Sequence, residues 1–425
     1  MLNVYQNNIE ERLRQTAARA ALDLDRRETK TVARIIKDVR RHGDRAVVKY
    51  TRKFDRVCPR NLRVDPLEIA LAREQIDKDL LKALRLAIKN IADYHLKQVP
   101  KSWLMKTGRK SHLGLRYSPM ASAGVYVPGG RAVYPSSLLM NVIPAKLAGV
   151  PRICVVTPPA PDGNANPALL AAAYELGINE IYLCGGAQAV AALAYGTETI
   201  PQVDMIVGPG NIYMTLAKKM LYGAVGLDKL AGPSDCLILA DKTASPKYVA
   251  ADMLAQSEHD PLASSLLITD SHKLVQRVLA EIKKQLVKSG RREIIAKSLR
   301  DHGGIFIIEN KADFARLADL AAPEHLHIML KNAESVAEQI NNAGAIFCGA
   351  YSPVALGDYF AGTNHVLPTG GTARFASPLS VDDFLKKTAL IEYAKSDLKA
   401  AQKYINILAQ TEGLTAHAVS VNVRF

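Results

Sequence analysis

The sequence predicts an α/β protein with two Rossmann-like parallel-sheet units, a helical N-terminal region and a small extended C-terminal tail. Short runs rich in β-branched residues alternate with Ala- and Leu-rich helical patterns from about residue 120 to residue 350. The alternation stops near residues 230–235 and then begins again. The first hundred or so residues show helical periodicity alone. Alternating strands and helices form right-handed βαβ units, in which helices cover the faces of a parallel sheet.

The N-terminal region is expected to be helical throughout. Residues 1–24 are expected to form a helical arm, and residues 31–54 carry an apolar stripe at helical spacing. This stripe consists of Val32, Ile35, Ile36 and Val39. A longer helical pattern extends from Pro66 to Gln98.

The first α/β unit is expected to have four strands. They are 124–128, 152–157, 180–184 and 203–207. Helices are expected to begin near Ser136, Asn166, Ala187 and Asn211. Asn166 followed by Pro167 is a favourable pair for the cap and first turn of a helix.

The second unit repeats the pattern with five expected strands. They are 236–240, 265–269, 304–308, 327–330 and 345–348. Helices are expected near Ser245, Ser271, Arg291, Lys311 and Asn332.

These patterns divide the chain into four parts. They are 1–24, 25–122 together with 235–375, 123–234, and 376–425. The last part shows a long helical pattern that we expect to end in a short strand at 414–425. A tail that extends past two complete units needs a surface to pack on, and a second subunit is a reasonable candidate.

The composition excludes several classes of protein. No run approaches the roughly 20 apolar residues that span a bilayer, and the polar N-terminus lacks an export signal, so we expect a cytoplasmic protein that binds no membrane. The net charge of +14 lies entirely in residues 1–117, which hold 28 Lys and Arg against 14 Asp and Glu. These basic residues follow amphipathic helices without interleaved aromatics, which is typical of a solvated face and not of a nucleic-acid-binding surface.

Gly-rich turns follow three of the expected strands in the first unit. They are VYVPGG (125–130), CGGAQA (184–189) and GPGN (208–211). Backbone amides at such strand-to-helix turns suit phosphate groups. The full G-x-G-x-x-G fingerprint is absent because Tyr213 takes the place of its third glycine. From the residues alone, tight turns and a nucleotide site remain equally good explanations.

Histidines and oxygen donors gather in polar segments of the second unit and the tail. The residues are Gln256, His259, Glu324, His325, His327, Asp358, His365, Glu412 and His417. Gln256 and His259 are three apart on a helical pattern and therefore share a face. Nitrogen and oxygen donors without sulfur fit zinc or a similar cation. The absence of an H-E-x-x-H motif is evidence against a zinc protease.

These segments together resemble the histidinol dehydrogenase family. The matching stretches, in the family's order from about residue 120 to residue 420, are GVYVPGG, GGAQAVAALAYGT, VDMIVGPGN, LAGPSD, AQSEHD, APEHL, GDYFAGTNHVLPTG and EGLTAHA. The resemblance implies oxidation of L-histidinol to L-histidine through histidinaldehyde, as the last step of histidine biosynthesis. It also implies two NAD+ per turnover, one zinc ion per subunit, and a homodimer whose active site is shared between subunits.

The resemblance also implies roles for individual residues. Glu324 would activate the water and His325 would accept the hydroxyl proton, whereas His327 is not a motif position and is expected to be structural. The implied zinc ligands are Gln256, His259, Asp358 and His417, the last from the partner subunit. His325 and the four implied zinc ligands are also implied to contact the substrate, together with Ser234, His365 and Glu412. The implied NAD contacts are Tyr126, Gln188 and Asn211, which makes 123–234 the NAD-binding domain, 25–122 with 235–375 the zinc and catalytic domain, and 376–425 the dimerisation tail.

Two departures from the family pattern and three rival interpretations remain. Asp235 stands where Glu is usual, and Ser257 stands where Ala is usual. A zinc-dependent hydrolase acting on a small polar metabolite is the alternative enzyme. An aldehyde dehydrogenase would need Cys184 or Cys236 as its nucleophile, although each cysteine is more simply a small buried hydrophobe. A basic nucleic-acid-binding protein is the alternative that is not an enzyme.

Overall fold

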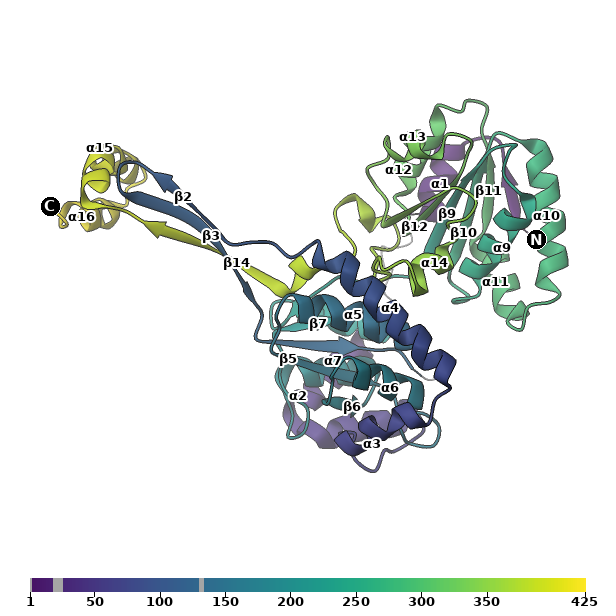
Figure 1. Ribbon diagram of the computed structural model, residues 1–425, viewed down its shortest axis with the longest axis horizontal. Helices are drawn as coiled ribbons and strands as arrows, with labels where there is room; N and C mark the ends of the chain where they lie inside the picture. Colours follow the sequence, from purple (N-terminus) through teal and green to yellow (C-terminus); the bar gives the residue numbers. More distant parts are fainter. Residues whose placement is uncertain (1, 18–25, 130–133) are drawn as a thin grey trace.

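The computed structural model describes residues 2–17, 26–129 and 134–425. Figure 1 shows two α/β bodies and a slender arm that extends away from them. The N-terminus lies in the second body, and the C-terminus lies at the far tip of the arm. Gly130, the last residue of the first predicted Gly-rich turn, lies outside the described residues.

The first body is built on a five-stranded parallel sheet in the order β6-β5-β4-β7-β8. Its strands are β4 (Ser122–Tyr126), β5 (Arg152–Thr157), β6 (Ile181–Leu183), β7 (Met205–Val207) and β8 (Gly226–Leu227). The four strands that the sequence predicts here are confirmed within a few residues. They read as nearly continuous apolar runs because both faces of the sheet are covered.

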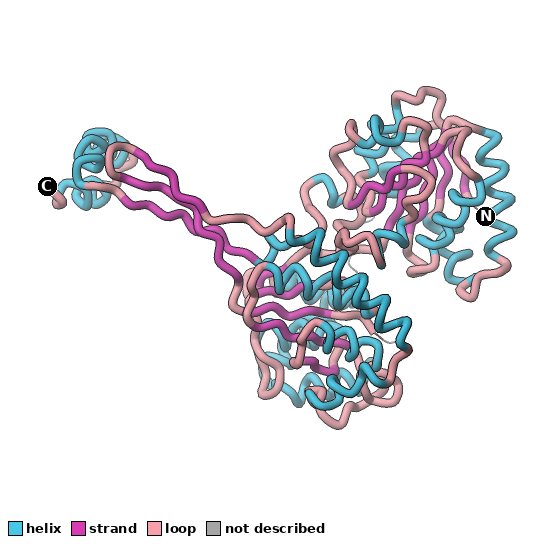
Figure 2. Tube along the Cα trace, in the orientation of Figure 1, coloured by secondary structure: helices cyan, strands magenta, loops and turns pink. Residues whose placement is uncertain are grey.

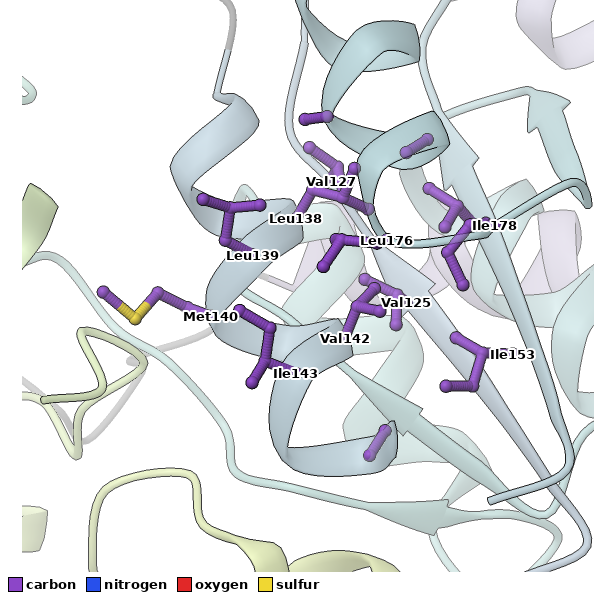
Figure 3. Close-up of a cluster of buried hydrophobic side chains, with 14 of the residues drawn as sticks. Val125, Val127, Leu138, Leu139, Met140, Val142, Ile143, Ile153, Leu176 and Ile178 are labelled. Carbon is purple, nitrogen blue, oxygen red and sulfur yellow. The ribbon is translucent and has the colours of Figure 1, made fainter. Parts of the chain in front are cut away.

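Helices cover both faces of this sheet. They are α2 (Arg26–Phe54), α3 (Pro66–Leu71), the 3-10 turn η2 (Ala72–Glu74), α4 (Lys78–Leu96), α5 (Pro135–Leu147), α6 (Pro167–Glu175), α7 (Gly186–Tyr195) and α8 (Ile212–Leu221). Val125 and Val127 point into the core beneath α5 and α6 (Figure 3). Tyr126, between them, points into the opposite core beneath α2, α7 and α8. Alternate side chains of one strand therefore stabilise both layers.

The N-terminal helices pack on the first body, which differs from the predicted division of the chain. Helix α2 lies against α7 and α8, and helices α3 and α4 lie against α6 and α5. The prediction instead placed residues 25–122 with 235–375. The apolar stripe of a helix does not reveal which sheet it covers, because any sheet face offers the same kind of contact.

The second body is built on a six-stranded parallel sheet in the order β1-β11-β10-β9-β12-β13. Its strands are β1 (Asn3–Tyr5), β9 (Asp235–Ala240), β10 (Ser264–Thr269), β11 (Gly304–Ile307), β12 (His325–Met329) and β13 (Ala345–Cys348). Its helical segments are α1 (Ile9–Ala17), α9 (Pro246–Ser257), α10 (His272–Leu286), α11 (Arg292–His302), α12 (Asp313–Ala321), α13 (Ala333–Ala337), α14 (Val354–Tyr359) and η3 (Thr372–Arg374). The five predicted strands are confirmed, whereas the edge strand β1 lies in a region expected to be helical.

The arm is an antiparallel sheet in the order β14-β3-β2 with two helices at its tip (Figure 2). Its elements are β2 (Trp103–Thr107), β3 (Ser111–Pro119), η4 (Val381–Phe384), β14 (Leu385–Glu392), α15 (Lys395–Thr411) and α16 (Thr415–Asn422). The strand expected at 414–425 is wrong, because this segment is the helix α16. It packs against α15, from which Gln402 and Asn406 donate hydrogen bonds to the Asn422 side chain at 2.7 and 2.9 Å.

Hydrogen bonds from side chains attach the segment that follows α14 to the first body. Lys229 Nζ donates to the carbonyl oxygens of Val366 and Ser377 at 3.1 and 2.8 Å. Asn364 Nδ2 donates to the carbonyl oxygen of Met140 at 2.7 Å. These bonds fix the segment that passes from the second body back over the first. A search of the described residues finds no helix with the length and apolarity to cross a bilayer.

Candidate active site

A cavity of about 840 Å³ lies where the two bodies meet. On the first body it is lined at the carboxyl ends of the strands, by residues that follow β4, β6 and β7. On the second body it is lined at the amino ends, since Ser234 precedes β9 and Glu324 precedes β12. The first edge is where parallel sheets usually bind ligands. The second edge becomes available because α9 runs back along the sheet and ends beside it at Ser257.

Tyr126, Gln188 and Asn211 all line the first-body side of the cavity, as expected from the sequence. Tyr126 Oη accepts a hydrogen bond from the Gly186 amide at 2.9 Å, and burial raises the pKa of this phenol to about 12. Asn211 caps α8, accepting from the amides of Tyr213 and Met214. Gln188 is buried, and its Oε1 has no hydrogen-bond partner among the described residues. A buried amide oxygen without a partner is a polar contact that a ligand can complete.

The turn after β7 has a conformation that only glycine tolerates. Gly208 has φ +110°, and a Cβ atom built on it would lie 2.2 Å from the carbonyl oxygen of Tyr126. The Gly208 amide donates to Asp228 at 2.9 Å, and its carbonyl oxygen accepts from Lys218 Nζ at 2.7 Å. Lys218 and Asp228 also form a buried ion pair of 2.6 Å. One ion pair therefore fixes both backbone polar groups of Gly208, which belong to successive peptide units, and orients the turn that leads to Asn211.

Glu324 lies on the floor of the cavity with its carboxylate held by two donors. Its Oε2 accepts from Ser234 Oγ at 2.5 Å and from the Asp235 amide at 2.9 Å. Gln256 Nε2 in turn donates to Ser234 Oγ at 2.8 Å. Burial raises the pKa of Glu324. A carboxylate with a raised pKa is a stronger base than an exposed one, which suits it to take a proton from water.

His325 lies beside Glu324 and faces a second carboxylate. Its Nδ1 is 3.7 Å from Glu324 Oε2, and its Nε2 is 3.8 Å from Asp358 Oδ1. Burial alone would lower the pKa of this imidazole, but the two carboxylates outweigh burial and raise the pKa to about 9. Nδ1 also lies 3.2 Å from the carbonyl oxygen of Asp235. Once the imidazolium has lost its proton from Nε2 and keeps the one on Nδ1 toward this carbonyl, Nε2 can accept a proton from a ligand in the cavity.

The remaining donors on this side surround the acid–base pair. His259, Asp358 and His365 all line the cavity. His365 Nδ1 lies 3.0 Å from the carbonyl oxygen of Asp358. Burial lowers the pKa of both His259 and His365, which favours the neutral imidazole that binds metal ions. Gln256 Oε1 is buried and lacks a hydrogen-bond partner in the described part of the chain.

Glu412 and His417 are not brought to this cavity within one chain. Glu412 is the C-cap of α15, and His417 lies in α16, both exposed at the tip of the arm. Figure 1 shows that the arm carries these helices away from both bodies. Within the described ranges, no three His, Cys, Asp or Glu side chains lie close enough together to hold a metal ion.

His327 does not line the cavity and is fully buried in the second body. Its Nδ1 lies 2.8 Å from Asp252 Oδ2, and its Nε2 lies 2.9 Å from the carbonyl oxygen of Gly349. Nε2 thus has a hydrogen-bond partner inside the fold, whereas Nδ1 lies within ion-pair distance of a carboxylate but has no hydrogen-bond partner among the described residues.

The cysteines offer little support for a thiol nucleophile. Cys184 and Cys236 are buried, and neither lines the large cavity. Burial raises the pKa of both thiols, so the reactive thiolate form is disfavoured.

Sequence reasoning missed other residues that line the cavity, among them Asp55, Tyr134, Arg291 and Tyr359. Asp55 directly follows α2, and no glycine, proline or metal-ligand spacing marks it in the sequence. It reaches the cavity only because α2 packs on the first sheet. Asp235 was noted only as a departure from the family, although it makes several hydrogen bonds beside Glu324.

The fold and site together define a class of protein: a two-body α/β protein whose cavity has Gly-rich turns suited to a nucleotide on one side and a buried carboxylate–imidazole pair on the other. A family model described as histidinol dehydrogenase matches residues 18–425. The histidinol dehydrogenase of Bacillus subtilis (strain 168) is 51% identical over 397 residues, 93% of each chain. That of Carboxydothermus hydrogenoformans (strain ATCC BAA-161 / DSM 6008 / Z-2901) is 48% identical over 419 residues, 98% of each chain.

A solved structure agrees with these relatives. The crystal structure of histidinol dehydrogenase from Elizabethkingia anophelis superposes with a TM-score of 0.94 at 35% identity, and covers 100% of this chain and 98% of that one. The chain belongs to the histidinol dehydrogenase family. The family predicted from the motifs is therefore confirmed, and the protein is an NAD-dependent oxidoreductase.

Proposed function

We propose that the protein oxidises L-histidinol to L-histidine at this cavity, through histidinaldehyde and with two NAD+ per turnover. The observation that carries the proposal is the adjacency of Glu324 and His325, which are only 6% and 4% exposed. They lie across one cavity from the Gly-rich turns of the first body. Oxidation of an alcohol to an acid needs proton transfer at two stages, and two bases beside a redox cofactor can serve both stages.

In the first stage, the alcohol loses a hydride from carbon and a proton from oxygen. NAD+ supplies the hydride acceptor in both stages. His325 Nε2 receives the hydroxyl proton as the carbon–oxygen double bond forms. Nε2 has no hydrogen-bond partner among the described residues, so it is free to face the substrate.

In the second stage, water adds to the aldehyde and the hydrate loses a second hydride. Glu324 takes a proton from the attacking water. Ser234 and the Asp235 amide hold one oxygen of this carboxylate, so the group does not need to reorient during the reaction. The aldehyde stays in the same cavity between the two stages, so it is oxidised before it can diffuse into solvent.

Zinc fits the donors at the second-body side of the cavity. Gln256, His259 and Asp358 would hold it with His417 of the partner subunit, all through oxygen or nitrogen. The buried Gln256 Oε1 without a partner supports this assignment. When bound, zinc supplies a cation that anchors the imidazole and amino nitrogens of the substrate. Ser234, His365 and Glu412 are the further substrate contacts in this proposal.

A homodimer would bring His417 and Glu412 to the cavity of the partner subunit. Residues of the arm expose large apolar side chains that a second subunit could cover, among them Trp103, Leu104, Met105, Ile391, Tyr404, Leu408, Val419 and Val423. One body supplies an amide, one imidazole and one carboxylate from the proposed zinc ligands. This leaves the proposed set of four protein ligands one donor short. The arm is the only proposed source of that donor.

The test follows NADH as purified protein is mixed with L-histidinol and NAD+. We expect two NADH per histidine formed, and loss of this turnover when a chelator removes the metal. The variant E324Q should stop at the aldehyde with one NADH, because the water is no longer activated. If the wild-type protein formed only one NADH per histidinol consumed and stopped at the aldehyde, the role given to Glu324 would be refuted. Turnover without NAD+ would instead favour the zinc-dependent hydrolase.

A further inference from the structure

We propose that Asp235 is a positioning residue that sets the geometry of Glu324 and His325. The inference rests on the proposed function, because it takes these two residues as the acid–base pair. Asp235 itself lines the edge of a small cavity behind the site and not the large cavity, so it acts through its neighbours.

The main chain of Asp235 contacts both members of the pair. Its amide donates to Glu324 Oε2 at 2.9 Å, and its carbonyl oxygen lies 3.2 Å from His325 Nδ1. The first contact orients the carboxylate. The second selects the tautomer that leaves Nε2 of His325 as a base. The position of the Asp235 backbone therefore affects both proton transfers.

The side chain of Asp235 keeps its backbone amide and carbonyl groups in place. Its Oδ1 accepts from the Glu324 amide at 2.8 Å, and its Oδ2 accepts from the Gly370 amide at 2.7 Å. The ladder between β9 and β12 begins one residue later, where Cys236 pairs with His325. The Asp235 carboxylate thus continues the contact between β9 and β12 one residue beyond their backbone pairing, as far as Glu324.

Gly370 connects this arrangement to the opposite wall. The segment around it contributes Val366, Leu367 and Thr369 to the lining of the large cavity. A carboxylate with one oxygen on Glu324 and the other on Gly370 joins the base to the wall that encloses the substrate. An amide in its place has only one acceptor oxygen and must turn an NH2 group toward one of the two backbone donors.

A small cavity of about 20 Å³ lies next to Asp235, lined also by Pro323, Leu262 and Gly370. A water molecule needs roughly 10–15 Å³ by the same measure, so a longer side chain has room here. Asp235→Glu can therefore keep both acceptor oxygens in place, which makes it the conservative variant of the test.

Asp241 offers a matched control at the other end of the same two strands. Its Oδ2 accepts from the Lys331 amide, just after β12, at 3.2 Å, and its Oδ1 accepts from Thr243. It is a buried carboxylate that joins β9 to the chain after β12, far along the sheet from the catalytic pair and outside the cavity lining. Asp241→Asn removes the same kind of contact without touching the site.

The experiment measures kcat, the KM for histidinol, NADH per histidine and melting temperature for the holoenzyme variants D235N, D235S, D235E and D241N. We expect D235N and D235S to lower kcat about 10- to 100-fold, as small misplacement of catalytic groups does, with KM changed less than about threefold. They should also release aldehyde, so that NADH per histidine rises above two. D235E should recover kcat to within about fivefold of wild type, and D241N should lower the melting temperature alone.

Wild-type kcat in folded D235N or D235S would overturn the inference, as would an equal loss of kcat in D241N. D235S carries the test if D235N does not fold, since serine is smaller and fits the space that Asp235 occupies. E324Q is measured alongside. If E324Q keeps wild-type turnover, the proposed function fails; if E324Q is impaired and the Asp235 variants are not, only the positioning role fails.

Discussion

At the scale of single residues, the site depends on a buried carboxylate whose position is fixed by defined hydrogen bonds. Ser234 and the Asp235 amide both donate to the same oxygen of Glu324. Glu324 and His325 could be predicted from the sequence, because acidic residues and histidines are unusual inside a strand-rich core. Asp55 and Asp235 could not be recognised in the same way. Their importance depends on neighbours that are distant in sequence.

Asp55 makes the stability of the apoprotein depend on pH. Burial raises the pKa of this carboxyl from 3.8 to about 6, and its Oδ2 has no hydrogen-bond partner in the described residues. The folded state thus favours the protonated form, and its stability falls as pH rises from about 4 to about 6. Asp55→Asn removes the charge. We expect the variant to be about 1–2 kcal/mol more stable than wild type at pH 7.5, after discounting a two-unit shift for partial exposure.

The measurement is urea unfolding of both proteins without cofactor at pH 4 and pH 7.5. At pH 4 the advantage of Asp55→Asn should largely vanish, because Asp55 is then protonated in the folded state and about half protonated in the unfolded state. A difference between the two proteins that stays constant over this range would contradict the assignment.

Gly208 tests how closely the cofactor-side turn approaches β4. Gly208→Ala combines a positive φ with a Cβ placed 2.2 Å from the Tyr126 carbonyl oxygen. Gly223, with φ +97° and nothing within 4 Å, is the matched control. We expect Gly223→Ala to cost about 1–2 kcal/mol of backbone strain with an unchanged KM for NAD+. Gly208→Ala should cost more and raise this KM at least about fivefold. Steady-state kinetics and thermal melting measure both effects, and equal behaviour of the two variants would exclude a steric role.

At the scale of elements, strands buried on both faces were the features that the sequence predicted best. Each of the nine predicted strands in the two bodies is present, because a short apolar run between turn residues has few other structures available. The strands of the arm were missed, since β2 is largely exposed and lacks that pattern. The edge strand β1 has only three residues and exists through its pairing with β11. Strands whose partners are distant in sequence give little local signal.

The ion pair of Lys218 and Asp228 links α8 to the turn that precedes it. Lys218→Met leaves a buried carboxylate without its cation and the Gly208 carbonyl oxygen without a donor. Removing one partner of a buried pair costs about 3–5 kcal/mol of unfolding free energy. We also expect the KM for NAD+ to rise, because Asn211 lies on the turn that this pair holds.

The neighbouring Lys219 is exposed and provides the control, Lys219→Met. Chemical denaturation and NAD+ titration should separate the two lysine variants. The double variant Lys218→Met with Asp228→Leu removes the unpaired charge, so it should regain part of the stability while the KM for NAD+ stays high. A double variant with a wild-type KM would show that the ion pair does not position the turn.

At the scale of the whole molecule, the arm is the feature that a single subunit does not explain. It extends the chain into solvent and ends in two helices whose apolar residues are exposed (Figure 1). The pairing of β2, β3 and β14 holds it in shape. The Asp397 carboxylate adds hydrogen bonds, which it accepts from the amides of Arg109 and Lys110 and from Ser111 Oγ. Because this network ties the β2–β3 turn to the start of α15, the strands hold the helices of the tip at a fixed distance from the bodies.

A shared active site makes a quantitative prediction for mixed subunits. E324Q is defective in the body and H417A is defective in the tip, so each homodimer should form almost no histidine. In a heterodimer, one cavity combines an intact body with an intact tip, and the other combines both defects. Equal amounts exchanged to random pairing give half heterodimers, so we expect about a quarter of the wild-type activity to return. If each subunit instead completes its own site, mixing restores nothing, whatever the degree of exchange measured by native mass spectrometry.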